Sequence, residues 1–549
     1  KKWELECEYQ SSIPYISNIQ ILKELLNRNE TVVLISDMYL PKEFIRNLLK
    51  KADPILSTVP LFLSSDYRTQ KTTKALFFDV YHALDYKFGR WIHYGDNPKA
   101  DGTIPQKLGI ETINHTVPRF NVYERQLVNF INSYDSYQIS ALFSRFKKTQ
   151  PPLEDICAYC YVSLYWVPYI SWVIRHAIKQ GLDCLYFISR DGYHLKRIAD
   201  TIIQEKHLNI ETHYIYGSRK AWRIPSQIHG IDEEFFGEFG NFADVTNYEM
   251  LLKAAVLTES EFAKMFPELV YLKDDGQITS STLSKIRETL CASKIYREYL
   301  LEEARRQREF VIHYLKQEIN FAQKFAFVEF WGRGYTQTCL ARLLWEADGK
   351  ESQNIFYYAR SIYPSEGNII RYNFTANTYS MIFIESIFAN LPYRSIASYK
   401  REHGKIIPVM QSCKNNMELH HALERLLPQF SKDFANLKLV DIQATEHSLF
   451  DFALSYFHNN QSDEIFAQTT ATLYDSVAIY GSITEYAPPI TLKAIMRWLN
   501  GEHFNTKNFK LSLARSPWLL RKAYSIYHGR IDGTRFILIL NKLRHKRKE

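Results

Sequence analysis

Short apolar runs alternate with helical patterns over the first 125 residues. The run "VVLI" at 32–35 ends in a Ser-Asp pair, and Pro41 then precedes a helical pattern. The same order recurs along this region, with strands predicted over 31–35, 61–64, 91–94 and 111–115 and helices over 19–28, 42–51 and 72–84. Strands that alternate with helices predict a parallel sheet covered by helices.

A second region of the same kind follows a helical connector, which we place at 126–182. Apolar strands are predicted over 184–189, 212–218, 325–330 and 354–359, and a helical insertion over about 230–322 separates the second strand from the third. From 415 onward the pattern is mostly helical. The chain is therefore predicted to be an α/β protein with four parts: 1–125, 126–182, 183–414 and 415–549.

The composition is that of a globular protein. Hydrophobic residues make up 46% and charged residues 23% of the 549 positions, which is enough to build large cores. Seven scattered cysteines favour a reducing compartment over a disulfide framework, and no signal peptide precedes the first region, so we expect a cytoplasmic location. The apolar run 158–174 reaches the minimum length of a membrane span, but its aromatic residues and Pro168 favour a buried helix.

The net charge of +8 is modest for this length and comes partly from the last forty residues, which end in "LNKLRHKRKE". No RNA- or DNA-binding motif accompanies this charge, so nucleic acid is not an expected partner. The mixture of aromatic, aliphatic and cationic residues leaves two interpretations of the C-terminus open. It is either an ordinary solvated helix or a peripheral contact with an anionic membrane surface.

Polar side chains follow successive strands of the first region. Ser36 comes after "VVLI", Lys71 comes after the strand at 61–64, and Asp96 and Asp101 belong to "GDNPKAD" after "WIHY". Because the carboxyl ends of parallel strands meet at one edge of a sheet, we expect these side chains to converge. Phosphoryl transfer needs a donor for phosphate oxygens, a cation to neutralise them and carboxylates for Mg²⁺.

In order and wording, "ISDMYLP", "SSDYRTQK" and "YGDNPKAD" resemble the haloacid-dehalogenase superfamily of phosphohydrolases, in a branch found in multidomain proteins of bacterial surface-polysaccharide synthesis. The resemblance covers residues 15–115. It implies that Ser36 binds phosphate as the second motif, that Lys71 is the third motif, and that Asp96 and Asp101 form the fourth motif, which binds Mg²⁺.

The family's first motif, a strand ending in DxDxT whose first Asp is the nucleophile, should precede Ser36. Residues 1–31 contain no such element. Either the nucleophile lies upstream of Lys1 in a longer polypeptide or the domain is a degenerate scaffold. The joint presence of all four later residues favours the first alternative.

The second region also carries polar and glycine-rich turns after its strands. Glycine-rich turns that lead into a helix bind anions through backbone N–H groups, and neighbouring arginines suit phosphate or pyrophosphate. No P-loop is present and the glycine spacing is not GxGxxG, which argues against a kinase or a dinucleotide enzyme. The residues concerned are Ser189, Arg190, Asp191, Ser218, Arg219, Arg223, Glu329, Gly332, Arg333, Gly334 and Thr336.

The wording "FISRDGY", "YGSRKAWRIP", "WGRGYTQT" and "IESIFANLPYRSI" resembles the region that follows the phosphatase-like domain in the same polysaccharide proteins. There it is assigned as a phosphoribosyltransferase-like glycosyltransferase. The resemblance implies transfer of 5-phosphoribosyl from phosphoribosyl pyrophosphate to a glycan acceptor, free or lipid-linked, at the inner face of the bacterial membrane or in the cytoplasm. The phosphatase then removes the 5-phosphate and leaves ribofuranose.

In such a site, the resemblance implies that the arginines 190, 219 and 333 hold pyrophosphate and the 5-phosphate. Asp191 or Glu329 would bind Mg²⁺ or stabilise the ribosyl transition state, and Glu385 and Arg394 would line the acceptor side. The donor loop departs from the family pattern, because Phe330 replaces its second acid. Two alternatives stay open: a Mg²⁺-dependent phosphatase whose C-terminal region is a recognition module, and a non-enzymatic assembly module of a polysaccharide synthase complex.

Overall fold

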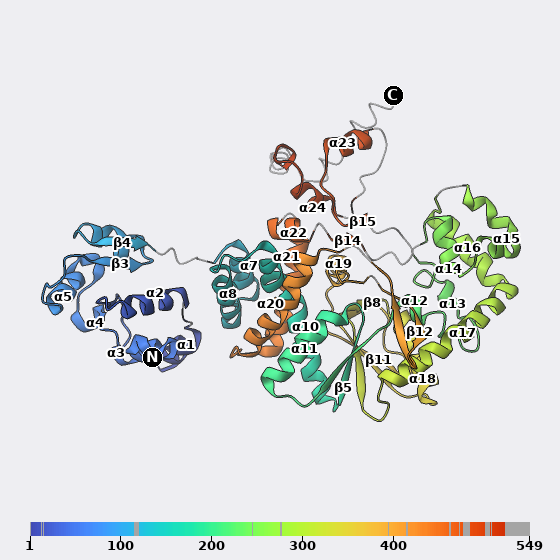
Figure 1. The fold of residues 1–549 in the computed structure, drawn as a ribbon, viewed down its shortest axis with the longest axis horizontal. Coiled ribbons are helices and arrows are strands. Elements are labelled where there is room, and N and C mark those ends of the chain that lie inside the picture. The colour runs from blue at the N-terminus through green and yellow to red at the C-terminus, as the bar shows by residue number, and fades with distance from the viewer. Residues whose placement is uncertain are drawn as a thin grey trace. The chain divides into compact units, whose positions relative to one another are not determined.

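The structure, a computed structural model, divides into two compact units, Lys1–Gln150 and Pro151–Glu549 (Figure 1). Their boundary falls inside the predicted connector. The structure describes residues 2–521 except 13, 15, 115–119, 244, 275–276, 394, 413–414, 461–462, 471–472, 476–483, 500–505 and 507. The basic C-terminal segment that we considered for membrane contact, and the candidate Arg394, lie outside the described residues.

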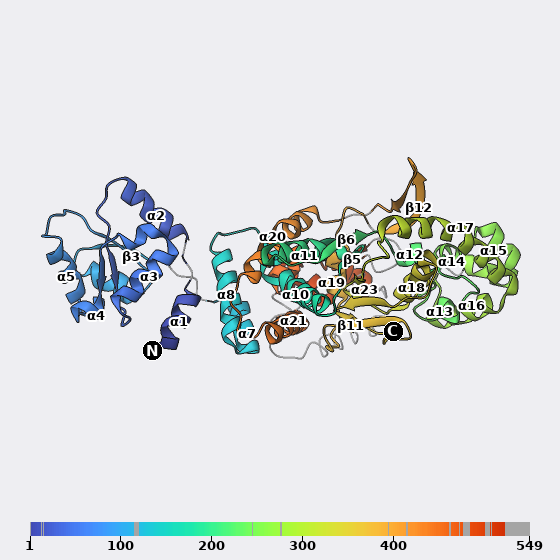
Figure 2. The same ribbon diagram turned by 90° about the horizontal axis from the view of Figure 1, so that it is seen from below.

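Unit 1 is built from short parallel strands and helices, as the alternating pattern predicted (Figure 2). Among the described residues its strands form two parallel pairs rather than one hydrogen-bonded sheet: β1 (Leu34–Ser36) with β2 (Leu61–Leu63), and β3 (Ile92–Gly95) with β4 (Glu111–Asn114). Unit 1 has two apolar clusters, and Ile35 and Trp91 pack against both of them. The two pairs of strands therefore share a core. The helices are α1 (Lys2–Ser11), α2 (Ile16–Asn27), α3 (Lys42–Ala52), α4 (Ser64–Tyr67), α5 (Ala75–Ala83), α6 (Ile104–Gln106), α7 (Val122–Ile131) and α8 (Tyr134–Lys147).

Unit 2 contains a five-stranded, wholly parallel sheet in the order β11-β9-β7-β5-β6. Four strands were predicted: β5 (Cys184–Ile188), β6 (Glu211–Ile215), β7 (Phe325–Val328) and β9 (Asn354–Tyr358). The edge strand β11 (Ile369–Asn373) was not. The chain leaves β5 toward β6 and returns on the other side of β5 as β7, so the direction of winding reverses between β5 and β7. In open α/β sheets, ligands bind outside the carboxyl ends of the strands at such a reversal.

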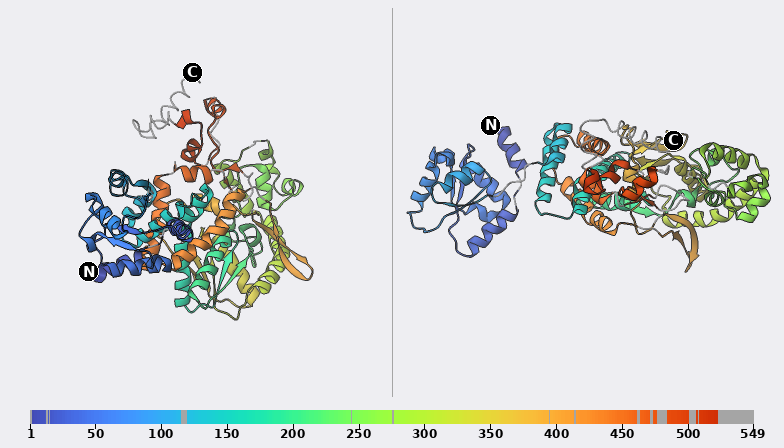
Figure 3. Two further views of the ribbon diagram at one scale, coloured as in Figure 1. Left: turned by 60° about the vertical axis from the view of Figure 1, so that its left-hand side comes forward. Right: turned by 90° about the horizontal axis from the view of Figure 1, so that it is seen from above.

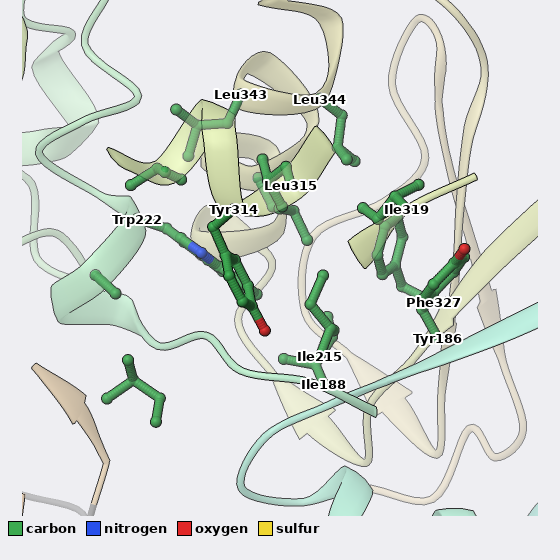
Figure 4. Packing of buried hydrophobic residues seen from close by; sticks show 14 of the residues in the cluster. Tyr186, Ile188, Ile215, Trp222, Tyr314, Leu315, Ile319, Phe327, Leu343 and Leu344 are labelled. Carbon is green, nitrogen blue, oxygen red and sulfur yellow. The ribbon is translucent and has the colours of Figure 1, made fainter. Parts of the chain in front are cut away.

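Helices cover both faces of this sheet. On one face, α10 (Ser163–Lys179) and α11 (Gly192–Lys206) pack together, and α20 (Met417–Ala435) and α21 (Ile442–Asn459) pack on them. On the other face, α17 (Lys294–Glu318) and α18 (Tyr335–Asp348) supply Tyr314, Leu315, Leu343 and Leu344 to a core that also contains the strand residues Tyr186 and Phe327 (Figure 4). These large apolar side chains fix the sheet on which the site is built.

The segment between β6 and β7 is helical, which confirms the predicted insertion. It has its own apolar core, which includes Phe235, Phe262, Leu283 and Tyr296. Its elements before α17 are α12 (Arg219–Trp222), α13 (Glu233–Phe236), α14 (Tyr248–Ala255), α15 (Glu259–Met265) and α16 (Ser280–Ala292).

The remainder of unit 2 is mostly helical after residue 415 in the described part, as predicted. Its further helices are α19 (Ile382–Phe388), α22 (Glu464–Thr469), α23 (Leu492–Leu499) and α24 (Phe509–Ala514). The unpredicted hairpin β12 (Ile396–Glu402) with β13 (Lys405–Met410) stands out from the sheet (Figure 3). The apolar helical stretch Leu153–Lys179 is long enough to cross a membrane, yet 89% of its most apolar window is buried inside the protein.

Candidate functional site

Asp101 is the centre of a buried polar cluster in unit 1. Its Oδ1 accepts a hydrogen bond from Lys71 Nζ at 2.5 Å and lies 2.9 Å from His93 Nε2, and its Oδ2 accepts from the Asn97 backbone N–H at 3.1 Å. Lys71 follows β2, whereas His93 and Asp101 belong to β3 and the helical turn after it. The predicted convergence of Lys71 and Asp101 is therefore a direct ion pair.

The environment of Asp101 stabilises its charged form. Burial alone raises the pKa of its carboxyl, but the hydrogen bonds from His93 and Lys71 and the charge of Lys71 outweigh burial, and the pKa lies well below its usual value. Gly95 makes room for this carboxyl, because a Cβ at that position would lie 2.3 Å from Asp101 Cβ and Cγ. His93 was missed in the sequence, where nothing distinguishes it from another polar strand residue.

The other predicted residues of unit 1 lie at strand ends. Ser36 is the last residue of β1 and is half-buried, and Asp96 follows β3 and is exposed. Asp37, beside Ser36, accepts the backbone N–H of Lys71 at 3.0 Å and so ties the first turn to the second. Both oxygens of Asp101 already accept hydrogen bonds from protein groups, Oδ1 from Lys71 and Oδ2 from the Asn97 backbone, whereas the carboxyl of Asp96 is exposed.

Asp191 and Glu329 form the second candidate site. They follow the neighbouring strands β5 and β7, at the reversal of the sheet. The backbone N–H of Phe330 donates a hydrogen bond to the Asp191 carboxyl, and Gln337 Nε2 from the first turn of α18 donates to Glu329 Oε2. Tyr169 of α10 donates to the Glu329 carbonyl oxygen. Both carboxyl groups are thus held by neighbouring elements.

Burial raises the pKa of both Asp191 and Glu329, so the two carboxyl groups do not readily carry a negative charge at the same time. It raises the pKa of Asp191 to about 6, although the charges of Arg190 and Arg219 lower it. It raises the pKa of Glu329 to about 8, with the negative charge of Asp191 adding to the effect and the hydrogen bond from Gln337 opposing it. Near pH 7 the two groups therefore hold about one proton between them. Titratable groups with such displaced pKa values are typical of active sites.

Cationic and anionic side chains surround the pair. Arg190 Nη2 lies 3.2 Å from Glu385 Oε1, and Arg190 Nε lies 3.8 Å from Asp191 Oδ1. Arg219 is close enough for its charge to lower the pKa of both Asp191 and Glu329. Glu385 Oε2 is buried without a hydrogen-bond partner among the described residues. The predicted Arg190, Asp191, Arg219, Glu329 and Glu385 are therefore brought into one neighbourhood.

The glycine turn after β7 lies against this neighbourhood. A Cβ on Gly332 would lie 3.6 Å from Glu329 Oε2. Gly334 has a φ of +104°, and a Cβ there would lie 2.6 Å from Tyr363 Cβ. Arg371 of β11 donates to the Gly334 carbonyl at 3.3 Å and holds the turn in place.

Other predicted residues make contacts within the fold. Ser218 caps α12, accepting from the Ala221 N–H at 3.1 Å and donating to the Ile396 carbonyl at 2.6 Å. Thr336 Oγ1 accepts from the buried Arg223 at 3.2 Å. The exposed Arg333 stacks over the ring of Phe239 at 3.9 Å. Ser189 exchanges hydrogen bonds with the backbone of Gly217, which joins the ends of β5 and β6.

The sequence pattern indicated the strand ends but missed Tyr169 and Gln337, which come from the flanking helices and carry no motif. The arrangement that results is a pair of acids with raised pKa values next to two arginines. It can bind a polyanion and exchange a proton with it or with an acceptor. No protein-family model matches the sequence, and no curated protein matches it.

Proposed function

We propose that the protein is a two-activity enzyme of bacterial surface-polysaccharide synthesis. Unit 2 transfers 5-phosphoribosyl from phosphoribosyl pyrophosphate to a hydroxyl of a glycan acceptor, and unit 1 contributes to removal of the 5-phosphate. The proposal combines the motif resemblance with one observation that carries it. That observation is the Asp191–Glu329 pair at the sheet reversal, with its displaced pKa values and neighbouring arginines.

The roles of the residues follow from their charges. Arg190 and Arg219 suit the diphosphate of the donor, because a guanidinium fork matches phosphate oxygens. Asp191, the more acidic of the pair, is mostly ionised at pH 7. It would stabilise the positive charge that develops on the ribosyl ring as the bond to diphosphate breaks, or accept the proton of the attacking hydroxyl. Glu329, with the higher pKa, keeps its proton and limits the charge of the site.

The residues present fit the expected Mg²⁺ of this site. Mg²⁺ binds through one or two carboxylates and substrate phosphates, and Glu385 Oε2 is a buried carboxylate oxygen that lacks a partner among the described residues. Asp191 and Glu385 are the carboxylates that would hold the ion. When bound, it would neutralise charge on the diphosphate leaving group.

The test is release of pyrophosphate from phosphoribosyl pyrophosphate, together with calorimetric binding of this donor. We expect Arg190→Ala to weaken donor binding and pyrophosphate release at least tenfold, and Asp191→Asn to lower the release. Arg306→Ala, at an exposed position of α17, is the matched control and should leave both unchanged. Equal behaviour of Arg190→Ala and Arg306→Ala in folded protein would rule out the donor site.

The contact between Lys71 and Asp101 supports a second, separate activity in unit 1. A buried ammonium in the turn that follows β2 and α4, next to an acidic turn, suits a phosphate monoester. β1 and β3 are not hydrogen-bonded to each other in the part of the chain that the structure describes. A strand carrying the family's nucleophile would join the two pairs if it lay between them.

Phosphate release from a 5-phosphoribosyl glycoside, by a polypeptide that also carries the family's first motif, tests this second activity. We expect Asp96→Asn to abolish it and Lys87→Met, at an exposed position, to leave it intact. Unchanged phosphate release by Asp96→Asn would exclude the assigned role of that residue, whatever the outcome for the transferase.

A further inference from the structure

Three potential metal ligands gather at the start of α20, away from the groups discussed so far. His420, His421 and Glu424 occupy its first turns, and one ligand atom of each lies within 4.8 Å of the others. Residues three and four positions apart share a helix face, which accounts for the approach of both imidazoles to Glu424. His420 is buried and His421 is exposed, so the cluster extends from the interior to the surface.

The spacing within the cluster is that of metal ligands rather than of hydrogen bonds. Glu424 Oε2 lies 3.6 Å from His420 Nε2 and 3.5 Å from His421 Nδ1. An N–H···O hydrogen bond spans about 2.7–3.2 Å. Two ligands that each lie about 2.0–2.1 Å from a tetrahedral Zn²⁺ are about 3.3 Å apart. One oxygen therefore stands at nearly the right distance from two nitrogens to share an ion with them.

The second oxygen of Glu424 is held by other groups. Tyr193 OH donates to Oε1 at 2.6 Å, and Arg197 Nη1 lies 4.0 Å from the same atom. Arg197 also donates to the Glu424 carbonyl at 3.1 Å. These contacts direct Oε2 toward the imidazoles, which is how outer-shell hydrogen bonds orient a ligating carboxylate.

An independent observation comes from His194 of α11, which lies behind His420. Its ring is 1% exposed, and neither ring nitrogen has a hydrogen-bond partner among the described residues. The rings of His194 and His420 meet edge to face, with centroids 5.6 Å apart. Trp166 stacks on His194, and its Nε1 also lacks a described partner. A buried polar group without a partner costs about 1–3 kcal/mol, so these nitrogens indicate a water molecule or another polar group next to the His194 ring.

We propose that His420, His421 and Glu424 bind one Zn²⁺ ion, with a water molecule as the fourth ligand and His194 as a hydrogen-bond partner of that water. Two imidazoles with one carboxylate favour Zn²⁺ over Mg²⁺, which prefers oxygen ligands. The site joins α20 to α11, whose first turn follows Asp191. It does not depend on the proposed transferase activity.

A second group of possible ligands, Cys184, Glu211 and His213, provides an internal control. Its carboxylate is already used, because Gln323 Nε2 donates to Glu211 Oε2 at 3.1 Å. Cys184 is fully buried at the start of β5, and the other two side chains are exposed. We found no unpartnered buried nitrogen beside it in the described chain.

The experiment is calorimetric titration of untagged, chelator-treated full chain with Zn²⁺, repeated with Co²⁺ for its visible spectrum. We expect one equivalent of Zn²⁺ to bind with a dissociation constant of about 1 μM or lower and Co²⁺ to give the bands of a four-coordinate nitrogen and oxygen site. His421→Ala and Glu424→Gln should weaken binding at least a hundredfold, whereas His213→Ala should bind like the parent.

The His421 side chain is 65% exposed, so its removal leaves the fold intact, which circular dichroism of the metal-free variant checks. Zn²⁺ should also raise the melting temperature of the parent and of His213→Ala but not that of His421→Ala. The proposal is overturned if the parent binds no stoichiometric Zn²⁺, if His421→Ala and Glu424→Gln bind as the parent does, or if His213→Ala loses binding equally.

Discussion

Replacing Glu329 by glutamine should stabilise unit 2 increasingly as the pH rises. The folded protein holds the pKa of this carboxyl at about 8, chiefly through burial, whereas the ordinary value is 4.5. Above the ordinary value the unfolded chain releases the proton and the folded chain keeps it, so parent stability falls between about pH 4.5 and pH 8. Glutamine does not titrate, and its side-chain oxygen can still accept the hydrogen bond from Gln337.

The size of the change in stability follows from how far the pKa of Glu329 lies above its ordinary value. A difference of 3.5 between the folded and ordinary pKa values corresponds to at most about 5 kcal/mol, of which about 3 kcal/mol develops between pH 5 and pH 8. For a unit of roughly 400 residues, with an unfolding entropy of about 2.1 cal/mol/K per residue, this is about 4 °C in melting temperature.

Thermal melting of the parent and of Glu329→Gln at pH 5, 6, 7 and 8 measures this effect. The melting temperature of the variant minus that of the parent should grow by about 4 °C over the series. Glu346→Gln, at an exposed position of α18, is the control and should show a constant difference. A difference for Glu329→Gln that stays flat, or falls, with pH would refute the protonated state of Glu329.

Three further predictions concern the contacts that organise the two sites. Lys71→Met should cost unit 1 about 3–5 kcal/mol, because it leaves the buried Asp101 without its cation, and hydrogen exchange of unit 1 amides measures the loss. Since the pKa of Asp101 is depressed, its stabilisation is present above the ordinary value of 3.8 and is lost as the pH falls below it. The protection of unit 1 amides, corrected for the intrinsic exchange rate at each pH, should therefore fall more between pH 6 and pH 3 in the parent than in Lys71→Met. Gly334→Ala combines a φ of +104° with a clash against Tyr363 and should cost more than about 2 kcal/mol, whereas Gly349→Ala, with φ +77° and open space around it, should cost about 1 kcal/mol in thermal melting.

The sequence predicted the central strands because a parallel sheet buried on both faces needs continuous apolar runs. "CLYFI" in β5 and "FAFV" in β7 are such runs, and their carboxyl ends therefore located Asp191 and Glu329. The edge strand β11, "IIRYN", escaped prediction because Arg371 and other polar residues interrupt it. The order of the strands, and with it the reversal at β5, is a matter of long-range packing that no local pattern encodes.

The sequence also could not predict the direction in which the side chains point. Arg190 and Arg333 stand in similar turns, yet Arg190 contacts Glu385 and Asp191, whereas Arg333 stacks on Phe239 from the insertion. The insertion residue that captures Arg333 is nearly a hundred positions away, so local spacing cannot distinguish the two arginines. The same holds for Gln337, whose role depends on how α18 meets β7.

The pairing of β5 with β7 has a consequence for biosynthesis. Cys184 of β5 faces Phe325 of β7, about 140 residues later in the chain, with the whole helical insertion between them. At about 5–20 residues per second, a ribosome needs roughly 7–28 seconds to make that stretch. During this interval one edge of the apolar strand β5 has no strand to form hydrogen bonds with. Unpaired edges of this kind promote association between chains. Substitutions that slow folding of the insertion should therefore lower the yield of soluble protein while leaving the folded protein unchanged.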